Sequence, residues 1–459
     1  MKTNRVIKIF LASSEELEAD RYRFGNLIRK LDNIYEKRGI RIELFEWEDY
    51  DAAYNGMRKQ DEYNERVRAS DMFLALFHKK AGKFTIEEFN IARKAFDEQA
   101  SPKIYTYIKD LEAGESESRE LAEFKRLMLE ELGHYWCRYS NFDTMQLHFV
   151  LQLQMVEATT PIKVEVKESQ VKIGDSTIAD LNNVPFTSEN TTHKELKSRK
   201  EQLDREIGNA ESGGRRGFFG QRSRTTDEEL ANLRAERESV TEQIERQEKA
   251  LVDTAMSIAR MQGGECSSRM RTAAELFEKG ETGKAEAVLK EDDMEADATN
   301  AKLKFDTAAQ PTAELARNIE RCAGEYMLKA RIVISGIADE SRYLKAAKLM
   351  STAIDLVSGR LPEETLAEYL FDYAVLLTDA GQQTKALETW ERLSGIYERL
   401  YRKAPQKYAY GYAGVLNNMA VLYSNKGDFD HCLSKYLKAV DIYDRLDREE
   451  PGIYDDDIA

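Results

Sequence analysis

Proline, cysteine and long apolar runs are all scarce in this sequence. The chain has 459 residues with only seven prolines and four cysteines, and a third of its residues are charged. This composition indicates a mostly helical, well-solvated protein. The cysteines (Cys137, Cys266, Cys322 and Cys432) show no metal-like spacing, so we predict reduced thiols in a cytoplasmic protein and no metal site.

Other absences exclude several classes of protein. No apolar run has the length that a membrane-spanning helix needs, so we expect no membrane association. Residues 6–12 are too short and too interrupted by charge for a signal peptide. The net charge of -15 argues against a general nucleic-acid binder, although it leaves room for a local basic patch. Neither a GxGxxG nor a Walker motif occurs in the first 157 residues, which weakens the common dinucleotide and nucleotide-triphosphate interpretations.

The first 157 residues alternate between strand-like and helix-like segments. Short apolar runs at 6–12, 40–45, 72–77, 103–108 and 135–139 are separated by segments with helical spacing of apolar residues. This alternation predicts a flavodoxin-like α/β domain, 1–157, in which helices cover both faces of a five-stranded parallel sheet. We expect the strand order 2-1-3-4-5.

A carboxylate pair follows the third of these strands. Thr85 and Glu88 have the spacing of a capping box, so a helix is predicted to begin at Thr85 and to hold Glu87 and Glu88 in its first turn. In open parallel sheets, ligands bind at the carboxyl ends of the strands. The same edge would gather several further candidate substrate-binding residues: Ser13, Ser14, Trp47, Asp49, Tyr50 and Asn64.

Several short strings in this region resemble those of a known family. They are IFLASS (9–14), FEWEDY (45–50), QDEYN (60–64), SDMFLALF (70–77) and GKFTIEEFNIA (82–92). Together they resemble a bacterial TIR-like (Toll/interleukin-1 receptor-like) domain, of the type often fused to tetratricopeptide repeats. The resemblance implies an NAD hydrolase of anti-phage immunity that cleaves the nicotinamide–ribose bond, with NAD as substrate and no further cofactor. It also implies that Glu88 is the essential glutamate; in the alternative alignment, the essential glutamate is Glu87.

The chemistry of that cleavage asks for a carboxylate. As nicotinamide leaves, the ribose carbon becomes positively charged, and a nearby carboxylate can stabilise or capture it. A position near a helix N-terminus would favour the ionised form of Glu88, and Trp47 or Tyr50 would be able to stack on a flat ring. The alternatives are structural: Glu88 only completes a capping box, Trp47 belongs to the core, and Ser13 caps the first helix together with Glu16.

The middle of the chain is predicted to contain a linker and a helical hairpin. Residues 158–190 show two short alternating runs, which predict a small strand pair. Residues 191–262 carry an apolar seam at coiled-coil spacing, which predicts an antiparallel coiled-coil hairpin. The joint at 213–224 is rich in glycine, arginine and phenylalanine. It is interpreted either as a disordered tip or as a docking patch for an acidic partner or nucleic acid.

The last part of the chain, 265–459, contains an internal repeat. Gly381 and Gly427 are 46 residues apart, and so are Pro405 and Pro451. The pattern resembles elongated tetratricopeptide repeats, whose stacked helices would bind a protein or peptide ligand. Because the sequence stops where the next first helix would continue, we expect a truncated array that favours self-association.

Three hypotheses follow for the function. In the first, the TIR-like domain hydrolyses NAD when oligomerisation through the TIR-like and coiled-coil regions, controlled by the repeats, activates it. In the second, the domain only self-associates and the repeats recruit a partner. In the third, the carboxylate serves a nucleoside or nucleotide ribosyl transferase or hydrolase.

Overall fold

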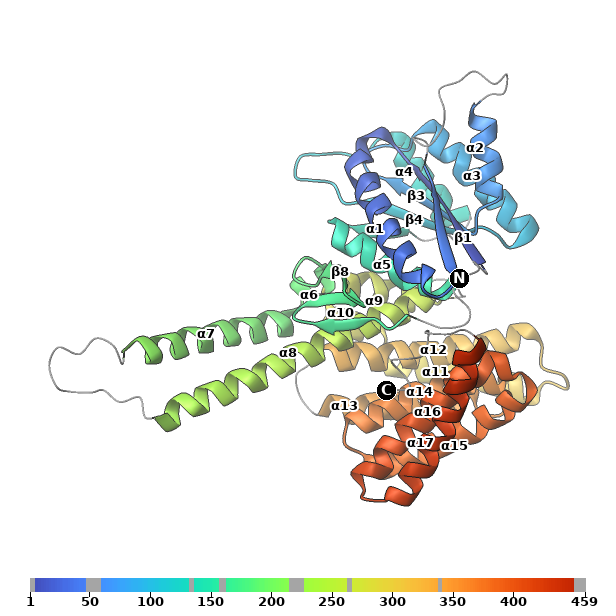
Figure 1. Cartoon of the computed structure of the whole chain (residues 1–459). Helices are drawn as coiled ribbons and strands as arrows, with labels where there is room; N and C mark the ends of the chain where they lie inside the picture. The colour runs from blue at the N-terminus through green and yellow to red at the C-terminus, as the bar shows by residue number, and fades with distance from the viewer. Residues whose placement is uncertain are drawn as a thin grey trace. The chain divides into compact units, whose positions relative to one another are not determined.

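The chain folds into two compact units, each described by itself below. The computed structural model describes residues 5–46, 59–131, 136–156, 162–213, 227–261, 266–336 and 341–449. The first unit consists of Met1–Val150 and Lys172–Ala179, and the second of Leu151–Val171 and Asp180–Ala459. The first contains a parallel sheet and the second is mostly helical (Figure 1).

A five-stranded parallel sheet organises the first unit. Its strands are β1 (Arg5–Ser13), β2 (Ile40–Phe45), β3 (Met72–Phe77), β4 (Lys103–Lys109) and β5 (Trp136–Tyr139). The order is β2-β1-β3-β4-β5, which confirms the predicted order. The central strand β3 is buried at all six positions, because helices cover both faces of the sheet and leave no polar alternation.

The helices of this unit fall on the two faces of the sheet. They are α1 (Glu18–Glu36, preceded by the turn η1, Glu15–Leu17), α2 (Lys59–Arg68), α3 (Lys83–Gln99), α4 (Arg119–Arg126, continued by a π-helical turn) and α5 (Phe142–Val156). Phe73 and Phe77 of β3 pack in one core cluster with Phe89 of α3 and Phe124 of α4. Phe24 of α1 meets Phe149 of α5, with ring centroids 4.8 Å apart.

Three short strands follow: β6 (Glu165–Lys167), β7 (Gln170–Ile173) and β8 (Ser176–Asp180). They form a sheet in the order β6-β7-β8, where the sequence predicted only two strands. Strand β8 was not predicted, because Ile178 and Ala179 are adjacent and do not alternate with polar residues.

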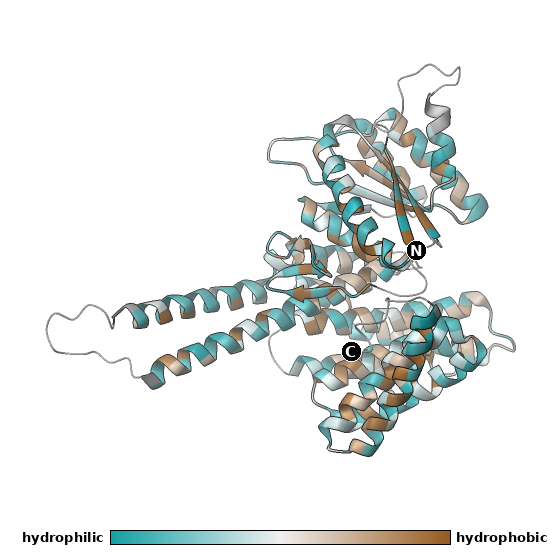
Figure 2. Cartoon of the chain, in the orientation of Figure 1, coloured by the Kyte–Doolittle hydropathy of each residue, from teal (hydrophilic) through white to brown (hydrophobic). Residues whose placement is uncertain are grey.

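Two long helices come next, after the short helix α6 (Pro185–Ser188). Helices α7 (Thr191–Gly213) and α8 (Asp227–Met261) pack along an apolar seam, in which Leu203 meets Val240 and Ile244 and is flanked by Leu196 and Leu233. Most residues of the two helices outside this seam are hydrophilic (Figure 2).

The rest of the second unit is a succession of packed helices (Figure 1). They are α9 (Ser268–Glu278), α10 (Thr282–Val288), α11 (Glu291–Thr307), α12 (Ala313–Gly336), α13 (Ser341–Val357), α14 (Glu363–Asp379), α15 (Gln383–Lys403), α16 (Pro405–Asn425) and α17 (Phe429–Glu449). From α12 onward each helix packs against the next.

Both ends of α15 and α17 show the same 46-residue offset, since these helices begin at Gln383 and Phe429 and end at Lys403 and Glu449. The glycines before them adopt matching left-handed turns, with φ of 67° at Gly381 and 76° at Gly427. Among the helices in the described ranges, none combines the length and apolarity needed to cross a bilayer.

Candidate functional site

The helix that carries the two glutamates begins earlier than predicted. Helix α3 starts at Lys83, and Gly82 precedes it in an extended conformation without a side-chain cap. The amide of Ile86 already donates to the carbonyl of Gly82 at 3.0 Å. The predicted capping box between Thr85 and Glu88 is therefore wrong, and both glutamates lie in the second turn, where the field of the helix terminus is weak.

Glu88 belongs to the buried face of this helix. Thr85, Glu88, Phe89 and Ala92 recur at helical spacing and are all buried, and Glu88 retains 7% of its exposure. Its neighbour Glu87 lies nearer the surface and accepts a 3.3 Å hydrogen bond from the side-chain amide of Asn64 on α2. The structure thus brings together three predicted site residues on adjacent helices.

The two serines after β1 are held by a buried arginine. Arg21 of α1 is 2% exposed, and its Nη1 donates to the hydroxyl of Ser13 at 2.9 Å and to the carbonyl oxygen of Ser14 at 2.8 Å. Ser13 therefore does not cap the first helix, whose N-cap residue is Leu17 and which has no side-chain cap. Arg21 fixes the backbone at the end of β1, beside the central strand.

Glu16 connects this turn to the loop after β3. One of its oxygens, Oε1, accepts from the Ser14 hydroxyl at 3.2 Å and from the backbone amides of Lys79 and Lys80 at 3.1 and 3.4 Å. The loops after β1 and β3 are therefore joined at the carboxyl edge of the sheet. In this strand order that edge is the topological switch point, where open α/β sheets bind ligands.

A second polar cluster lies at the ends of β4 and β5. Asp20 of α1 is 5% exposed, and its Oδ2 accepts from Lys109 Nζ and from the Tyr139 hydroxyl, each at 3.0 Å. Burial, with the negative charge of Asp20 as a further cause, raises the pKa of Tyr139 well above its usual value. Tyr139 therefore remains a hydrogen-bond donor to Asp20 throughout the physiological pH range.

The loop after β3 is also anchored from the loop that precedes α4. Glu115 forms an ion pair with Lys79, and its other oxygen lies 3.3 Å from His78 Nε2. The hydrogen bond with Glu115 raises the pKa of Lys79, and the same bond lowers the pKa of Glu115. These contacts hold the backbone ahead of α3 in a defined position.

Three predicted site residues, Trp47, Asp49 and Tyr50, lie outside the described residues. Within the described ranges, no group of three or more His, Cys, Asp or Glu side chains is arranged to hold a metal ion. No protein-family model matches the chain, and no curated protein matches it significantly.

Two residues of this edge, Asp20 and Arg21, were not predicted from the sequence. A signal was present, because Arg21 is four residues after Leu17 and three before Phe24, and Asp20 is four before Phe24. Both charged residues therefore fall on the apolar face of α1, where a charge must find a partner when it is buried. Their partners come from three different strands and cannot be identified from local sequence.

Proposed function

We propose that the first unit hydrolyses NAD, with Glu88 as the residue that acts on the ribose. The observation that carries the proposal is the position of this carboxylate, on the buried face of the helix that follows the central strand at the switch point. Three described residues of the strings that resemble TIR-like domains support it: Ser13 and Ser14 lie on β1 and its turn, and Asn64 of α2 bonds to Glu87.

The reaction explains why a carboxylate belongs there. When the bond between nicotinamide and ribose breaks, the anomeric carbon gains positive charge, and a carboxylate against it stabilises that charge or forms a transient ester that water cleaves. Both routes give nicotinamide and ADP-ribose. The amide of Asn64 holds Glu87, so in this proposal Glu87 shapes the site and Glu88 meets the substrate.

The burial of Glu88 has a consequence for regulation. With 7% of its surface exposed, the carboxylate does not admit a ribose as the chain stands. Substrate entry then requires the surrounding chain to open, and we assign that step to assembly of several chains. NAD consumption per chain is accordingly expected to increase with protein concentration.

The same proposal extends to the second unit. The matching 46-residue offsets of α15 and α17, with left-handed glycines ahead of both, support tetratricopeptide-like repeats. The apolar seam between α7 and α8 supports a coiled-coil hairpin. In an anti-phage effector these parts would sense the trigger and control assembly.

The test is NAD consumption by the full chain across a wide range of protein concentration, followed by chromatography of nicotinamide and ADP-ribose. Glu88→Gln keeps the shape and removes the charge, so the rate should fall by about 100-fold or more. Glu87→Gln is the matched control and should retain most of the activity. If only Glu87→Gln loses activity, Glu87 and not Glu88 is the catalytic residue. Cleavage of deoxynucleosides without cleavage of NAD would favour the ribosyl-transfer hypothesis.

A non-catalytic scaffold is the second candidate, and the closed surroundings of Glu88 favour it. In that case the chain forms defined oligomers, yet NAD remains intact at every protein concentration. The same titration, read by light scattering and by chromatography, separates the two functions.

A further inference from the structure

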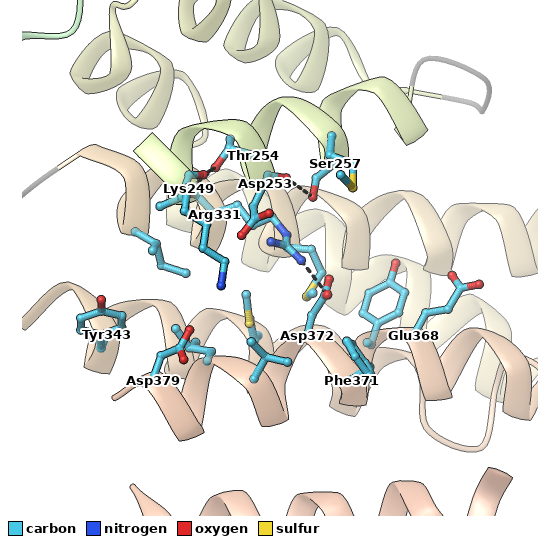
Figure 3. Close-up of a pocket in the computed structure, with 18 of the residues that line it drawn as sticks. Lys249, Asp253, Thr254, Ser257, Arg331, Tyr343, Glu368, Phe371, Asp372 and Asp379 are labelled. Carbon is cyan, nitrogen blue, oxygen red and sulfur yellow. Dashed lines mark hydrogen bonds and ion pairs between the residues drawn. The ribbon is translucent and has the colours of Figure 1, made fainter. Parts of the chain in front are cut away.

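The helices of the second unit border a cavity whose charges do not favour one class of ligand. It lies between α8, α12, α14 and α16, and its volume is about 2290 Å³ (Figure 3). Helix α14 contributes Glu368, Asp372 and Asp379 to the lining, and Arg331 of α12 forms an ion pair with Asp372 at 2.6 Å. The whole lining carries seven cations and five carboxylates. The surface of α17, by contrast, is apolar over a continuous stretch of one face.

Helix α17 exposes a row of apolar side chains. Phe429, Leu433, Tyr436 and Leu437 are 69%, 60%, 38% and 60% exposed. Their spacing places them on one face of the helix, called the outer face of α17 below. No other element in the described part of the chain exposes more than two large apolar side chains. Together the four side chains present about 400 Å² of apolar surface, an area that marks interaction sites on soluble proteins.

The corresponding face of α15 is covered by α16. The Tyr423 hydroxyl donates to the Glu391 carboxylate at 2.9 Å, and the rings of Tyr401 and Tyr412 lie 5.7 Å apart. As the position falls from 401 to 391 along α15 it rises from 412 to 423 along α16, so these two helices are antiparallel. Glu391 corresponds to Leu437 of α17 under the 46-residue offset. The outer face of α17 is therefore the counterpart of a face that binds an antiparallel helix.

The two faces differ in how much of them is covered. Leu387 and Trp390 of α15 are 8% and 1% exposed, whereas their counterparts Leu433 and Tyr436 on α17 are 60% and 38% exposed. The ten residues that follow α17 in the sequence correspond to less than half of α16. They have no counterpart of the part of α16 that reaches Glu391. The occupant of the outer face must therefore come from elsewhere.

The outer face is also more apolar than its counterpart on α15. Phe429 corresponds to Gln383, and Leu437 corresponds to Glu391. A face that remained in water would favour the opposite difference, because exposed apolar area is unfavourable. These residues suit contact with another apolar surface. In the described part of this protein the one surface with such a row is the outer face of α17 itself, so a second copy of the chain is the matching partner.

The charges beyond the two ends of the outer face suit an antiparallel pair. Lys426, in the turn before α17, and Asp444 lie nine residues on either side of Lys435, and both are exposed. When two copies of α17 cross antiparallel at Lys435, Lys426 of each copy comes near Asp444 of the other. The neighbouring Asp441 is already paired with Arg445 of its own helix at 2.5 Å. The arrangement therefore brings opposite charges together at both ends.

We propose that the outer face of α17 binds the same face of a second copy of the chain, with the two helices antiparallel about a two-fold axis at Lys435. Leu433 of one copy then packs against Leu437 of the other, and symmetry repeats the contact. Two such faces bury about 800 Å² of apolar surface, which together with a polar rim reaches the lower limit of about 1,000 Å² for specific interfaces. We therefore expect a reversible dimer. The contact lies in the second unit and does not depend on the proposed hydrolase activity.

Sedimentation velocity of the full chain over a wide range of protein concentration tests the contact. We expect a reversible equilibrium between one and two copies. L433D combined with L437D should weaken the association by about tenfold or more, because each pair would bury four carboxylates without partners. L344D is the matched control and should leave the association unchanged, since Leu344 of α13 is 65% exposed and lies outside this face. Unchanged circular dichroism and melting temperature show that each variant remains folded.

Charge reversal tests the antiparallel arrangement. K426D and D444K should each weaken the association by about threefold or more, because each removes two ion pairs from the symmetric dimer and brings like charges together. The chain with both changes restores opposite charges and should associate as the original chain does. The proposal is overturned if the chain remains a single copy at every concentration, if L433D with L437D leaves the association unchanged, if L344D weakens it equally, or if the double reversal does not recover it.

Discussion

Replacement of Asp20 by asparagine should destabilise the first unit by about 2–3 kcal/mol. Asp20 accepts two hydrogen bonds at 3.0 Å, from Lys109 and Tyr139, and its side chain is 7% exposed. Hydrogen bonds to a charged group contribute about 1.5–3 kcal/mol each. The asparagine side chain would keep the bond to Tyr139 but lose the ionic one. Lys109 is 31% exposed, so part of that loss returns as hydration of its ammonium group.

A double-mutant cycle with Lys109→Met measures the interaction energy between Asp20 and Lys109. Lys109→Met alone leaves a buried carboxylate without its cation and should cost about as much as Asp20→Asn. The double variant removes both charges, so its cost should be smaller than the sum of the two by about 1.5 kcal/mol or more.

The assay is urea unfolding of the full chain, followed by tryptophan fluorescence. The three tryptophans are Trp47, Trp136 and Trp390, and only Trp390 belongs to the second unit. A Trp390→Phe background therefore restricts the signal to the first unit. A coupling energy below about 0.5 kcal/mol would refute the view that this cluster ties α1 to β4 and β5.

Three further predictions concern stability. Above about pH 10 the free energy of unfolding should fall less steeply with pH in Tyr139→Phe than in the original chain, because the pKa of Tyr139 is raised in the folded state and its ionisation therefore favours the unfolded chain. An equal dependence on pH in the two proteins would contradict this. Burial raises the pKa of Glu278 to about 7 in the folded chain. The protonated side chain therefore contributes its full stability below the pKa of the unfolded chain, and this contribution is lost as the pH rises through about 7. Glu278→Gln should therefore raise the melting temperature at pH 8 but not at pH 4. Gly280→Ala should cost about 2–3 kcal/mol, since its Cβ would lie 2.8 Å from the backbone of Glu189. Gly359→Ala is the control, because Gly359 has a similar φ and no atom lies within 4 Å of the position of its Cβ; it should cost about 1 kcal/mol. Equal costs for the two variants would show that the contact with Glu189 does not matter.

The strands were the most predictable part of the fold. The expected ranges 40–45 and 72–77 coincide with β2 and β3, because an apolar run bounded by charged or turn residues has few alternative ends. The start of α3 was predicted two residues late. Thr85 and Glu88 match a capping pattern, but the helix begins at Lys83, and local sequence does not decide between neighbouring starts.

The candidate site was predicted in part. The glutamates of α3 and the serines after β1 were placed at the correct edge, since strand order follows from the alternation of strands and helices. Arg21 and Asp20 were not identified, because a charged residue on a helix usually faces water. Their burial depends on donors and acceptors that residues far along the chain supply.

The sequence alone determined the parallel sheet, its strand order and the helical character of the second unit, because these follow from apolar periodicity and from short-range turn signals. Only the tertiary structure decided that Glu88 is buried, that Arg21 holds the end of β1, and that α14 presents three carboxylates to a cavity. The reason is physical: periodicity fixes which face of an element is apolar, whereas the environment of a single charge depends on which elements meet it in space.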